Sequence, residues 1–193
     1  MNRDLPAALP VLLTARLRLR PVRETDRASH FRLHADADTA RFLYNEPLTL
    51  DTQEAHFAAR STTRFPGDTE WGSLVIETRD DERFLGEMAF HLASITHSQV
   101  EVGYVLTHEA RGHGYATEAT TALIAFAFDV VGAHRVSGRL DARNERSARV
   151  LERVGMKREA HLRENEFVKG EWTDEVVYGV LEREWRARLA HGH

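Results

Sequence analysis

The sequence contains no cysteine. Disulfide bonds, thiolate metal sites and cysteine nucleophiles are therefore excluded, and any group transfer has to proceed without a thiol-linked enzyme intermediate. No run of residues approaches the roughly 18 apolar positions of a membrane-spanning helix. The segment 1–13 is interrupted by two prolines and is too short for a convincing secretion signal. We therefore expect a cytoplasmic protein.

An excess of one charge is also lacking. The chain carries 26 basic and 30 acidic residues, for a net charge of −4. Bulk charge therefore gives no attraction to nucleic acids or to membrane surfaces, and we expect neither as a partner. The Gly-x-Ser-x-Gly motif is absent as well, so the nucleophile elbow of α/β-hydrolases finds no support.

The composition itself is that of an ordinary globular protein, with 42% apolar and 29% charged residues in 193 positions. This length favours one domain with a sizeable core. We expect a single domain over residues 14–185, a loosely ordered N-terminus at 1–13 and a frayed C-terminal tail at 186–193.

Hydrophobic periodicity and turn signals predict a mixture of strands and helices. Strands are predicted at residues 16–20, 71–78, 83–92, 100–106, 135–140, 156–162 and 172–181. Helices are predicted at about residues 25–35, 36–42, 51–64, 117–131 and 144–154. This order, with several hairpins, indicates the α+β class around a mixed sheet. In the first strand, Arg16, Arg18 and Arg20 alternate with leucines, and we expect these arginines on a solvated face.

A glycine-rich stretch, Arg111 to Ala116, lies between a predicted strand and a predicted helix. Gly112 and Gly114 allow a sharp turn and leave backbone N–H groups uncovered. Together with the free donors at the start of the following helix, these groups predict an anion site suited to a phosphate or pyrophosphate. Arg111 and a protonated His113 could add charged contacts. The spacing matches neither the dinucleotide motif nor the P-loop, so a nucleotide is the weaker hypothesis.

Four motifs between residues 100 and 155 resemble the GNAT superfamily of acyl-CoA-dependent N-acyltransferases. They are Glu101-Val-Gly-Tyr104, Arg111-Gly-His-Gly-Tyr-Ala116, Asn144-Glu-Arg-Ser147 and Leu151-Glu-Arg-Val-Gly155. The opening Thr14-Ala-Arg-Leu-Arg-Leu-Arg-Pro21 and the closing Gly170-Glu-Trp172-x-Asp174 resemble the branch that acetylates ribosomal-protein N-termini at alanine or serine. The resemblance implies a GNAT-like mixed, mostly antiparallel sheet with flanking helices. Its two central parallel strands, 100–106 and 135–140, would splay apart.

The same resemblance implies acetyl-CoA as the cofactor, with CoA as the product. The splayed strand ends would leave backbone groups unpaired for the pantetheine arm, the glycine-rich loop would hold the pyrophosphate, and the next helix would add further contacts. The residues expected to bind the cofactor are Val105, Leu106, Thr107, Arg111, Gly112, His113, Gly114, Tyr115, Ala116, Asn144 and Ser147. Asn144 has two open interpretations, a helix cap or a pantetheine contact, and one residue can fill both.

Acyl transfer to an amine needs the amine neutral, so a general base has to remove a proton. Glu101 is the candidate, because it stands on the strand beside the implied cofactor groove. The alternative is an exposed strand residue that pairs with an arginine. Many relatives carry a tyrosine acid seven residues after the asparagine, where this chain has Leu151. Ser147 or water must then protonate the departing thiolate, unless Ser147 is simply a surface residue of its helix.

Two further sets of residues are weighed. His30 and His34 have i, i+4 spacing with Asp36 and Asp38 nearby, which could hold a metal, but we interpret them as a solvated helix face and predict no metal site. Trp172, Asp174 and Tyr178 fall on a late predicted strand and could line the acceptor pocket, but for Trp172 we favour a place in the core. By the resemblance, Phe42, Tyr44 and the helix from Asp51 would form a wall of the acceptor site.

The sequence thus predicts an N-acetyltransferase that moves an acetyl group from acetyl-CoA to a primary amine. The acceptor would be a protein N-terminus or a small amine, and transfer would be direct, with a carboxylate as general base. The alternative is a non-catalytic acyl-CoA-binding sensor or assembly module on the same fold. Family habit also allows a homodimer.

Overall fold

A computed structural model describes residues 5–191. Within them, eight strands form one sheet in the order β1-β2-β3-β4-β5-β6-β8-β7. The strands are β1 (Leu12–Leu13), β2 (Leu17–Pro21), β3 (Trp71–Thr78), β4 (Phe84–Ser94), β5 (Gln99–Leu106), β6 (Arg135–Asp141), β7 (Lys157–Val168) and β8 (Glu171–Leu181). β5 and β6 are parallel, and the other neighbours are antiparallel. The predicted α+β class with a mixed, mostly antiparallel sheet is confirmed.

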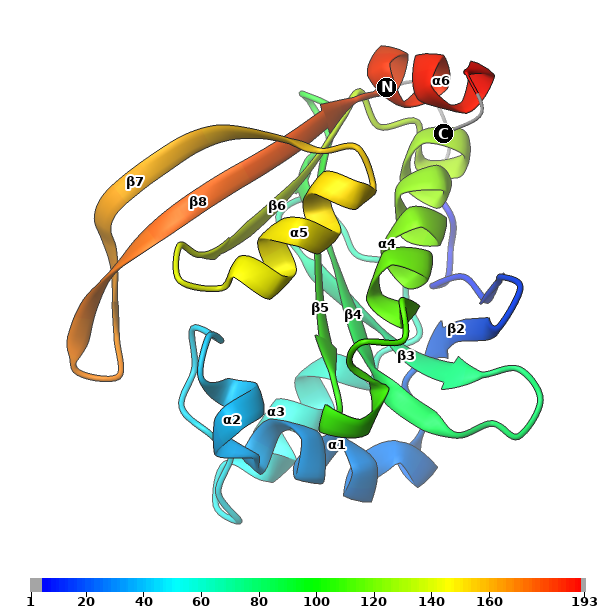
Figure 1. Cartoon of the computed structure of the whole chain (residues 1–193). Coiled ribbons are helices and arrows are strands. Elements are labelled where there is room, and N and C mark those ends of the chain that lie inside the picture. The colour runs from blue at the N-terminus through cyan, green and yellow to red at the C-terminus, as the bar shows by residue number, and fades with distance from the viewer. Residues whose placement is uncertain (1–4, 192–193) are drawn as a thin grey trace.

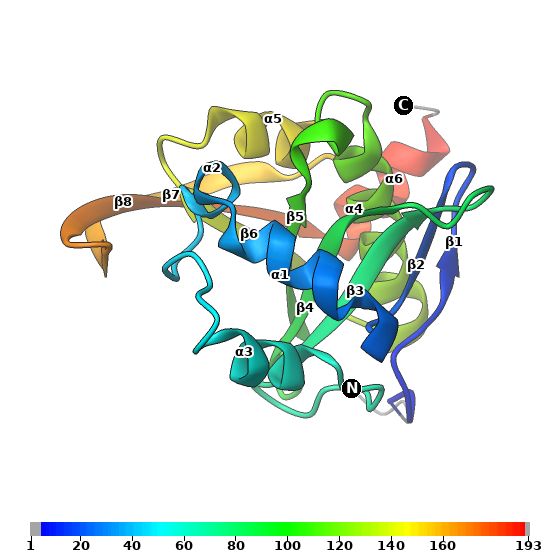
Figure 2. The same cartoon turned by 90° about the horizontal axis from the view of Figure 1, so that it is seen from below.

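Helices cover both faces of this sheet. They are α1 (Arg27–Ala35), α2 (Ala37–Ala40), α3 (Gln53–Arg60), α4 (Tyr115–Phe126), α5 (Glu145–Arg153) and α6 (Glu182–Ala190), with 3₁₀ turns η1 (Glu24–Asp26) and η2 (His108–Ala110) and a π-helical end of α4, η3 (Ala127–Val131). α4 packs on one face of the sheet and contributes Ala119, Leu123 and Ile124 to the main core. α1 and α3 lie on the opposite face (Figures 1 and 2), where Val22, Phe57 and Val75 form a second, smaller core.

The two parallel strands pair over a short distance and then separate. Their register runs from Gln99 with Arg135 to Glu101 with Ser137, whereas β5 continues to Leu106 and β6 to Asp141. Beyond this point β4 still pairs with β5 and β8 still pairs with β6, so each strand is held from its outer side. The predicted splay of the central strands is confirmed, and it opens a V-shaped gap in the sheet (Figure 1).

The arginines of β2 do not lie on a solvated face. The Arg20 side chain is buried and donates to both carboxylate oxygens of Asp26 at 2.7 and 2.9 Å, and it also pairs with buried Glu77 at 2.7 Å. Arg18 shares Glu77. The expectation of a solvated arginine face was therefore wrong for Arg20. A buried cation of this kind is tolerated because two carboxylates offset its desolvation.

The chain ends are more ordered than the sequence suggested. Leu9 is buried, and β1 pairs with β2. Residues 186–190, predicted as a tail, belong to α6, whose Trp185 enters the core. Residues 1–4 and 192–193 lie outside the described part of the chain. The core interpretation of Trp172 was wrong, because its side chain is 60% exposed and stacks edge-on against Phe167 in the β7–β8 hairpin.

No helix within residues 5–191 is long and apolar enough to cross a membrane.

Candidate active site

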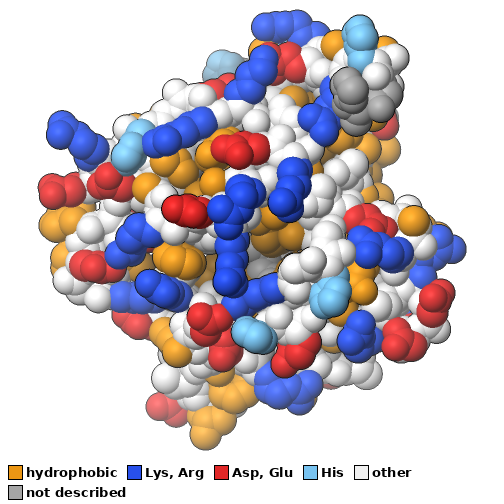
Figure 3. All heavy atoms as spheres, in the orientation of Figure 1, with side chains coloured by type: hydrophobic (Ala, Val, Ile, Leu, Met, Phe, Trp, Pro, Cys, Tyr) orange, Lys and Arg blue, Asp and Glu red, His pale blue; other side chains and the backbone are white. Residues whose placement is uncertain are grey.

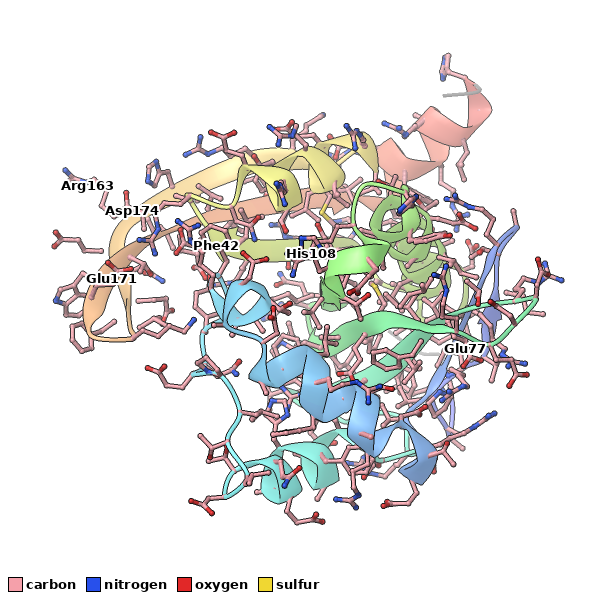
Figure 4. The ribbon with its side chains drawn as sticks, turned by 60° about the horizontal axis from the view of Figure 1, so that its bottom comes forward. Phe42, Glu77, His108, Arg163, Glu171 and Asp174 are labelled. Atoms are coloured by element: carbon pink, nitrogen blue, oxygen red, sulfur yellow. The ribbon has the colours of Figure 1, made fainter. Side chains whose placement is uncertain are left out.

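The V-shaped gap leads into a cleft of about 970 Å³ between the end of β5, the start of α4, α2 and α5. Lys and Arg side chains gather around this hollow in the space-filling view (Figure 3). Phe42, in the turn after α2, and His108, in η2, also line it (Figure 4). Seven of the expected cofactor residues line the cleft: Val105, Leu106, Arg111, Gly112, Ala116, Asn144 and Ser147. The lining does not include Thr107, His113, Gly114, Tyr115 or the proposed base Glu101.

The glycine-rich loop has the backbone that its sequence predicts. Gly112 and Gly114 have φ angles of 82° and 81°, in the left-handed region that favours glycine. α4 begins directly afterwards, and its first internal hydrogen bond runs from the Glu118 N–H to the Gly114 carbonyl. Within the described residues, no protein acceptor meets the N–H groups from Gly112 to Thr117. The turn therefore presents uncovered donors at the positive end of a helix.

The Arg111 side chain is engaged by protein groups. It donates to Asp38 and to the Thr39 hydroxyl from its two terminal nitrogens, and through Nε to the Leu106 carbonyl at 3.3 Å. Arg111 thus ties α2 to the loop, and an additional charged contact to a phosphate stays a prediction. His113 meets the chain through its carbonyl oxygen, which accepts from Arg16 at 3.0 Å.

The edge of β5 differs in detail from the expectation. The Thr107 N–H donates to the Leu85 carbonyl of the neighbouring segment at 2.9 Å, so the expectation that backbone groups near Val105, Leu106 and Thr107 are unpaired was wrong for this N–H. Partners alternate along an antiparallel strand, so Val105 also directs its backbone groups toward β4. Tyr104 and Leu106 direct theirs toward the gap. The Leu106 carbonyl accepts from Arg111, which leaves the Leu106 N–H as a donor facing the gap.

At the start of α5, Asn144 caps the helix. Its side-chain oxygen accepts the Ser147 N–H at 3.1 Å. The Ser147 hydroxyl in turn accepts from the Tyr104 hydroxyl at 3.1 Å. Burial raises the pKa of Tyr104 to about 12. Leu151 is buried against Gly138 and reaches the core instead of the cleft. Tyr104 therefore brings a phenol to the cleft that sequence spacing did not reveal.

Glu101 lies at the closed end of the gap, on the sheet face away from α4. It is the last β5 residue paired with β6, and its side chain is 18% exposed. Burial raises its pKa, while the Arg139 guanidinium at 3.5 Å opposes this and Glu175 adds to it. Arg139 also pairs with Glu175, which accepts the Tyr44 hydroxyl at 2.9 Å. Glu101 thus does pair with an arginine, but it is not an exposed strand residue.

Sequence reasoning missed a basic rim on α5. Arg146, Arg149 and Arg153 line the cleft, and their spacing of three and four residues places them on one helical face. Of these three, Arg149 pairs with Glu145 at 3.3 Å, and among the described residues no carboxylate pairs with Arg146 or Arg153. The spacing was visible in the sequence and could have indicated this rim, which suits an anionic ligand.

Comparison with known proteins identifies the family. A family model described as "Acetyltransferase (GNAT) domain" matches residues 16–157. The chain belongs to the GNAT acetyltransferase family. It is therefore an acyltransferase that uses acetyl-CoA, and the alternative of a non-catalytic module on this fold loses its support.

Individual relatives agree with this assignment. "Uncharacterized N-acetyltransferase YoaA" of Bacillus subtilis is 26% identical over 174 residues, which are 89% of this chain and 97% of the relative. "Putative ribosomal N-acetyltransferase YdaF" of the same organism is 33% identical over 105 residues, covering 54% and 57%. The structure of spermidine N-acetyltransferase from Vibrio cholerae in complex with CoA and spermine shares the fold, with a TM-score of 0.72, 18% identity and coverage of 90% and 99%.

Proposed function

We propose that this enzyme transfers an acetyl group directly from acetyl-CoA to a primary amine, with Glu101 as the general base. The amine is a protein N-terminal residue or a small amine. One observation carries the proposal: the β5–β6 pairing stops at Glu101. The gap that begins there leads into the cleft beside α4 and α5, and the Glu101 side chain lies where the pairing ends, on the other face of the sheet.

The described residues fit the donor. Acetyl-CoA, when bound, supplies an activated thioester. The uncovered N–H groups from Gly112 to Ala116 suit its diphosphate, because helix N-termini bind anions without a charged side chain. The backbone groups of Tyr104 and the N–H of Leu106, which face the gap, suit an amide-containing arm that adds like a short strand. The unpaired arginines of α5 suit a further phosphate.

Glu101 has the environment of a base. Its raised pKa keeps the carboxylate basic enough to accept a proton from an ammonium or from a water beside it. Arg139, at 3.5 Å, limits the rise and keeps the carboxylate available for this task. The acceptor amine would approach across β6 and β8, where Tyr44 and Glu175 form a hydrogen-bonded pair.

Tyr104 and Ser147 serve the leaving thiolate. A phenol with a pKa of about 12 remains protonated at neutral pH. Its transfer of a proton to a thiolate of ordinary pKa, about 8.5, would be uphill by roughly 5 kcal/mol. The Tyr104–Ser147 pair therefore acts by donating a hydrogen bond, through the Ser147 hydroxyl, and solvent supplies the proton afterwards.

One experiment with two arms tests the class of acceptor, because the names of the relatives point both to protein N-termini and to small amines. YdaF bears the name of a ribosomal N-acetyltransferase, and the Vibrio cholerae structure holds spermine. The acceptor face of this chain carries two carboxylates, Glu101 and Glu175, against one cation, Arg139, and this excess of negative charge would attract a cationic amine of either kind.

The test is an assay of thiol release by the purified chain with acetyl-CoA. One arm offers spermidine and other small amines, and the other offers peptides that begin with alanine or serine. Reactions without acceptor measure background hydrolysis, and calorimetry with CoA measures donor binding separately. We expect acceptor-dependent thiol release in one arm. If the chain binds CoA but releases no thiol in either arm, the proposal of a primary-amine acceptor is refuted. If it does not bind CoA, the proposed donor site is refuted as well.

A further inference from the structure

A buried cluster of three histidines and one glutamate joins α1 and α3 to the sheet. His30 and His34 come from α1, His56 from α3 and Glu87 from β4. The side chains of His30 and His34 are 1% and 5% exposed. The interpretation of these two residues as a solvated helix face was therefore wrong. His56, distant in the sequence, could not have been added from spacing alone.

The three imidazoles are arranged around one point. Their ring centroids lie 4.6, 4.7 and 5.0 Å apart, and one ring nitrogen from each lies within 4.8 Å of the other two. Three imidazoles on one tetrahedral ion, with metal–nitrogen bonds of about 2.0 Å, would have centroids about 5 Å apart. The closest nitrogens, His30 Nε2 and His56 Nδ1, are at 2.8 Å and would need to open by about half an ångström.

Glu87 fixes which nitrogens are available. Its two oxygens lie 2.6 Å from His30 Nδ1 and 3.1 Å from His34 Nε2. Each Glu87 oxygen thus faces one ring nitrogen, which is the arrangement of a carboxylate that accepts a hydrogen bond from each ring. A carboxylate can only accept, which places protons on these two atoms and leaves lone pairs on His30 Nε2 and His34 Nδ1. Metal-binding histidines are oriented by carboxylates in this way.

Two ring nitrogens of the cluster have no hydrogen-bond partner in the part of the chain that the structure describes. His34 Nδ1 and His56 Nε2 are buried and have no partner within the described residues. A proton shared between His30 and His56 satisfies only that pair, whichever ring donates it. Buried polar atoms without partners are rare in native proteins. An ion bound by His30 Nε2, His34 Nδ1 and His56 Nδ1 would give the His34 nitrogen a partner, whereas His56 Nε2 would keep none among the described residues. We propose that His30, His34 and His56 bind a divalent transition-metal ion of the zinc class, with Glu87 orienting two of the ligands.

The ligand type and the charges favour this class of ion. Neutral imidazole nitrogens suit Zn²⁺, Ni²⁺ and Co²⁺, whereas Mg²⁺ and Ca²⁺ prefer oxygen. Arg60 lies near enough to His56 to oppose a cation, and the Glu87 carboxylate offsets that charge.

The ion would have a structural role. Glu87 lies four residues along β4 from His91, which pairs with Glu101, so the cluster stands about 13 Å from the proposed base. The small apolar core on this face consists of Val22, Phe57 and Val75. An ion joining α1, α3 and β4 would therefore strengthen the attachment of the helices that cover the acceptor face (Figure 2).

The experiment measures metal binding by the full chain without an affinity tag. After treatment with a chelator and its removal, the protein is titrated with Zn²⁺ by calorimetry and with Co²⁺ by visible absorption, which reports tetrahedral coordination. We expect one ion per chain and a rise in the thermal midpoint. His56→Gln and His34→Gln should each weaken binding by at least tenfold, and Glu87→Gln by about 10- to 100-fold.

His191→Gln and His97→Gln are the controls, since both histidines are exposed and lie outside the cluster. They should bind the ion as the wild type does. His34 is buried, so its variant could misfold. The deciding variant is therefore His56→Gln, because His56 is only half-buried, and near-ultraviolet circular dichroism verifies that it is folded. Absence of Zn²⁺ and Co²⁺ binding, or equal binding by folded His56→Gln, would overturn the proposal. Loss of binding in His191→Gln would assign the ion to the C-terminal residues instead.

Discussion

Replacing Glu101 by glutamine should abolish most of the turnover while leaving the donor site intact. A positioned general base contributes about 10²–10⁴-fold, so kcat should fall at least a hundredfold, which corresponds to about 2.7 kcal/mol of activation free energy. The amide keeps the shape of the carboxylate, and Glu101 does not line the cleft. The affinity for acetyl-CoA should therefore change little.

The pH profile tests the same assignment through the charge beside Glu101. A carboxyl is inactive as a base below its pKa, so the rate rises with pH as Glu101 loses its proton. Burial raises this pKa, so the wild-type acidic limb should lie above the ordinary value of about 4.3. Arg139→Gln removes the cation at 3.5 Å that lowers the pKa, and should therefore move the limb to higher pH.

Initial rates of thiol release at saturating acceptor, measured across pH, provide the assay. The amine's own titration adds a second limb that all variants share. Glu109→Gln, an exposed glutamate in η2, is the matched control and should keep the wild-type profile. A wild-type rate for Glu101→Gln would remove Glu101 from the mechanism, and a limb that moves to lower pH in Arg139→Gln would refute the electrostatic argument.

Further substitutions test the cleft and the buried network. Gly112→Ala meets no neighbouring atom but places a side chain at φ 82°, so it should cost about 1–2 kcal/mol of stability and raise KM for acetyl-CoA more than it changes kcat, as urea unfolding and kinetics will show. Tyr104→Phe removes one hydrogen bond worth about 1 kcal/mol, so kcat should fall about fivefold with unchanged CoA affinity in calorimetry. Arg146→Ala should weaken the binding of acetyl-CoA more than the binding of dephospho-CoA in competition experiments. Equal losses of affinity would mean that the phosphate absent from dephospho-CoA binds elsewhere. Arg20→Met leaves buried Glu77 short of a partner and should lower the free energy of unfolding by about 3–5 kcal/mol in urea, whereas a change below 1 kcal/mol would mean that the network is solvated.

The sequence predicted the features that local chemistry determines. The turn at Gly112 and the helix after it follow from glycine and from apolar spacing, and both were placed correctly to within two residues. The splay of β5 and β6 came from family resemblance alone, because no local pattern states where two strands stop pairing. The pairing of Thr107 with Leu85 depends on the register of β4, which the sequence does not show.

Contacts between distant segments explain the remaining errors. Arg20 alternates with leucines as a solvated residue would, yet Asp26 and Glu77 bury it. Tyr104 and Ser147 are 43 positions apart and meet only because α5 packs beside the end of β5. Such pairs need tertiary coordinates, since neither partner has an unusual neighbourhood in the sequence.

The two faces on either side of the gap differ in charge, and in the proposed mechanism this difference would guide the two substrates to different sides. The cleft side carries the arginines of α5 and the uncovered N–H groups at the start of α4, so it attracts an anionic donor. The opposite face carries the carboxylates of Glu101 and Glu175 against the single cation of Arg139, so its excess of negative charge would attract a cationic amine. In the proposed mechanism donor and acceptor would approach from different faces and meet where β5 leaves β6. A sheet paired along its full length would keep them apart, so the local loss of strand pairing at Glu101 is what the proposed catalysis requires.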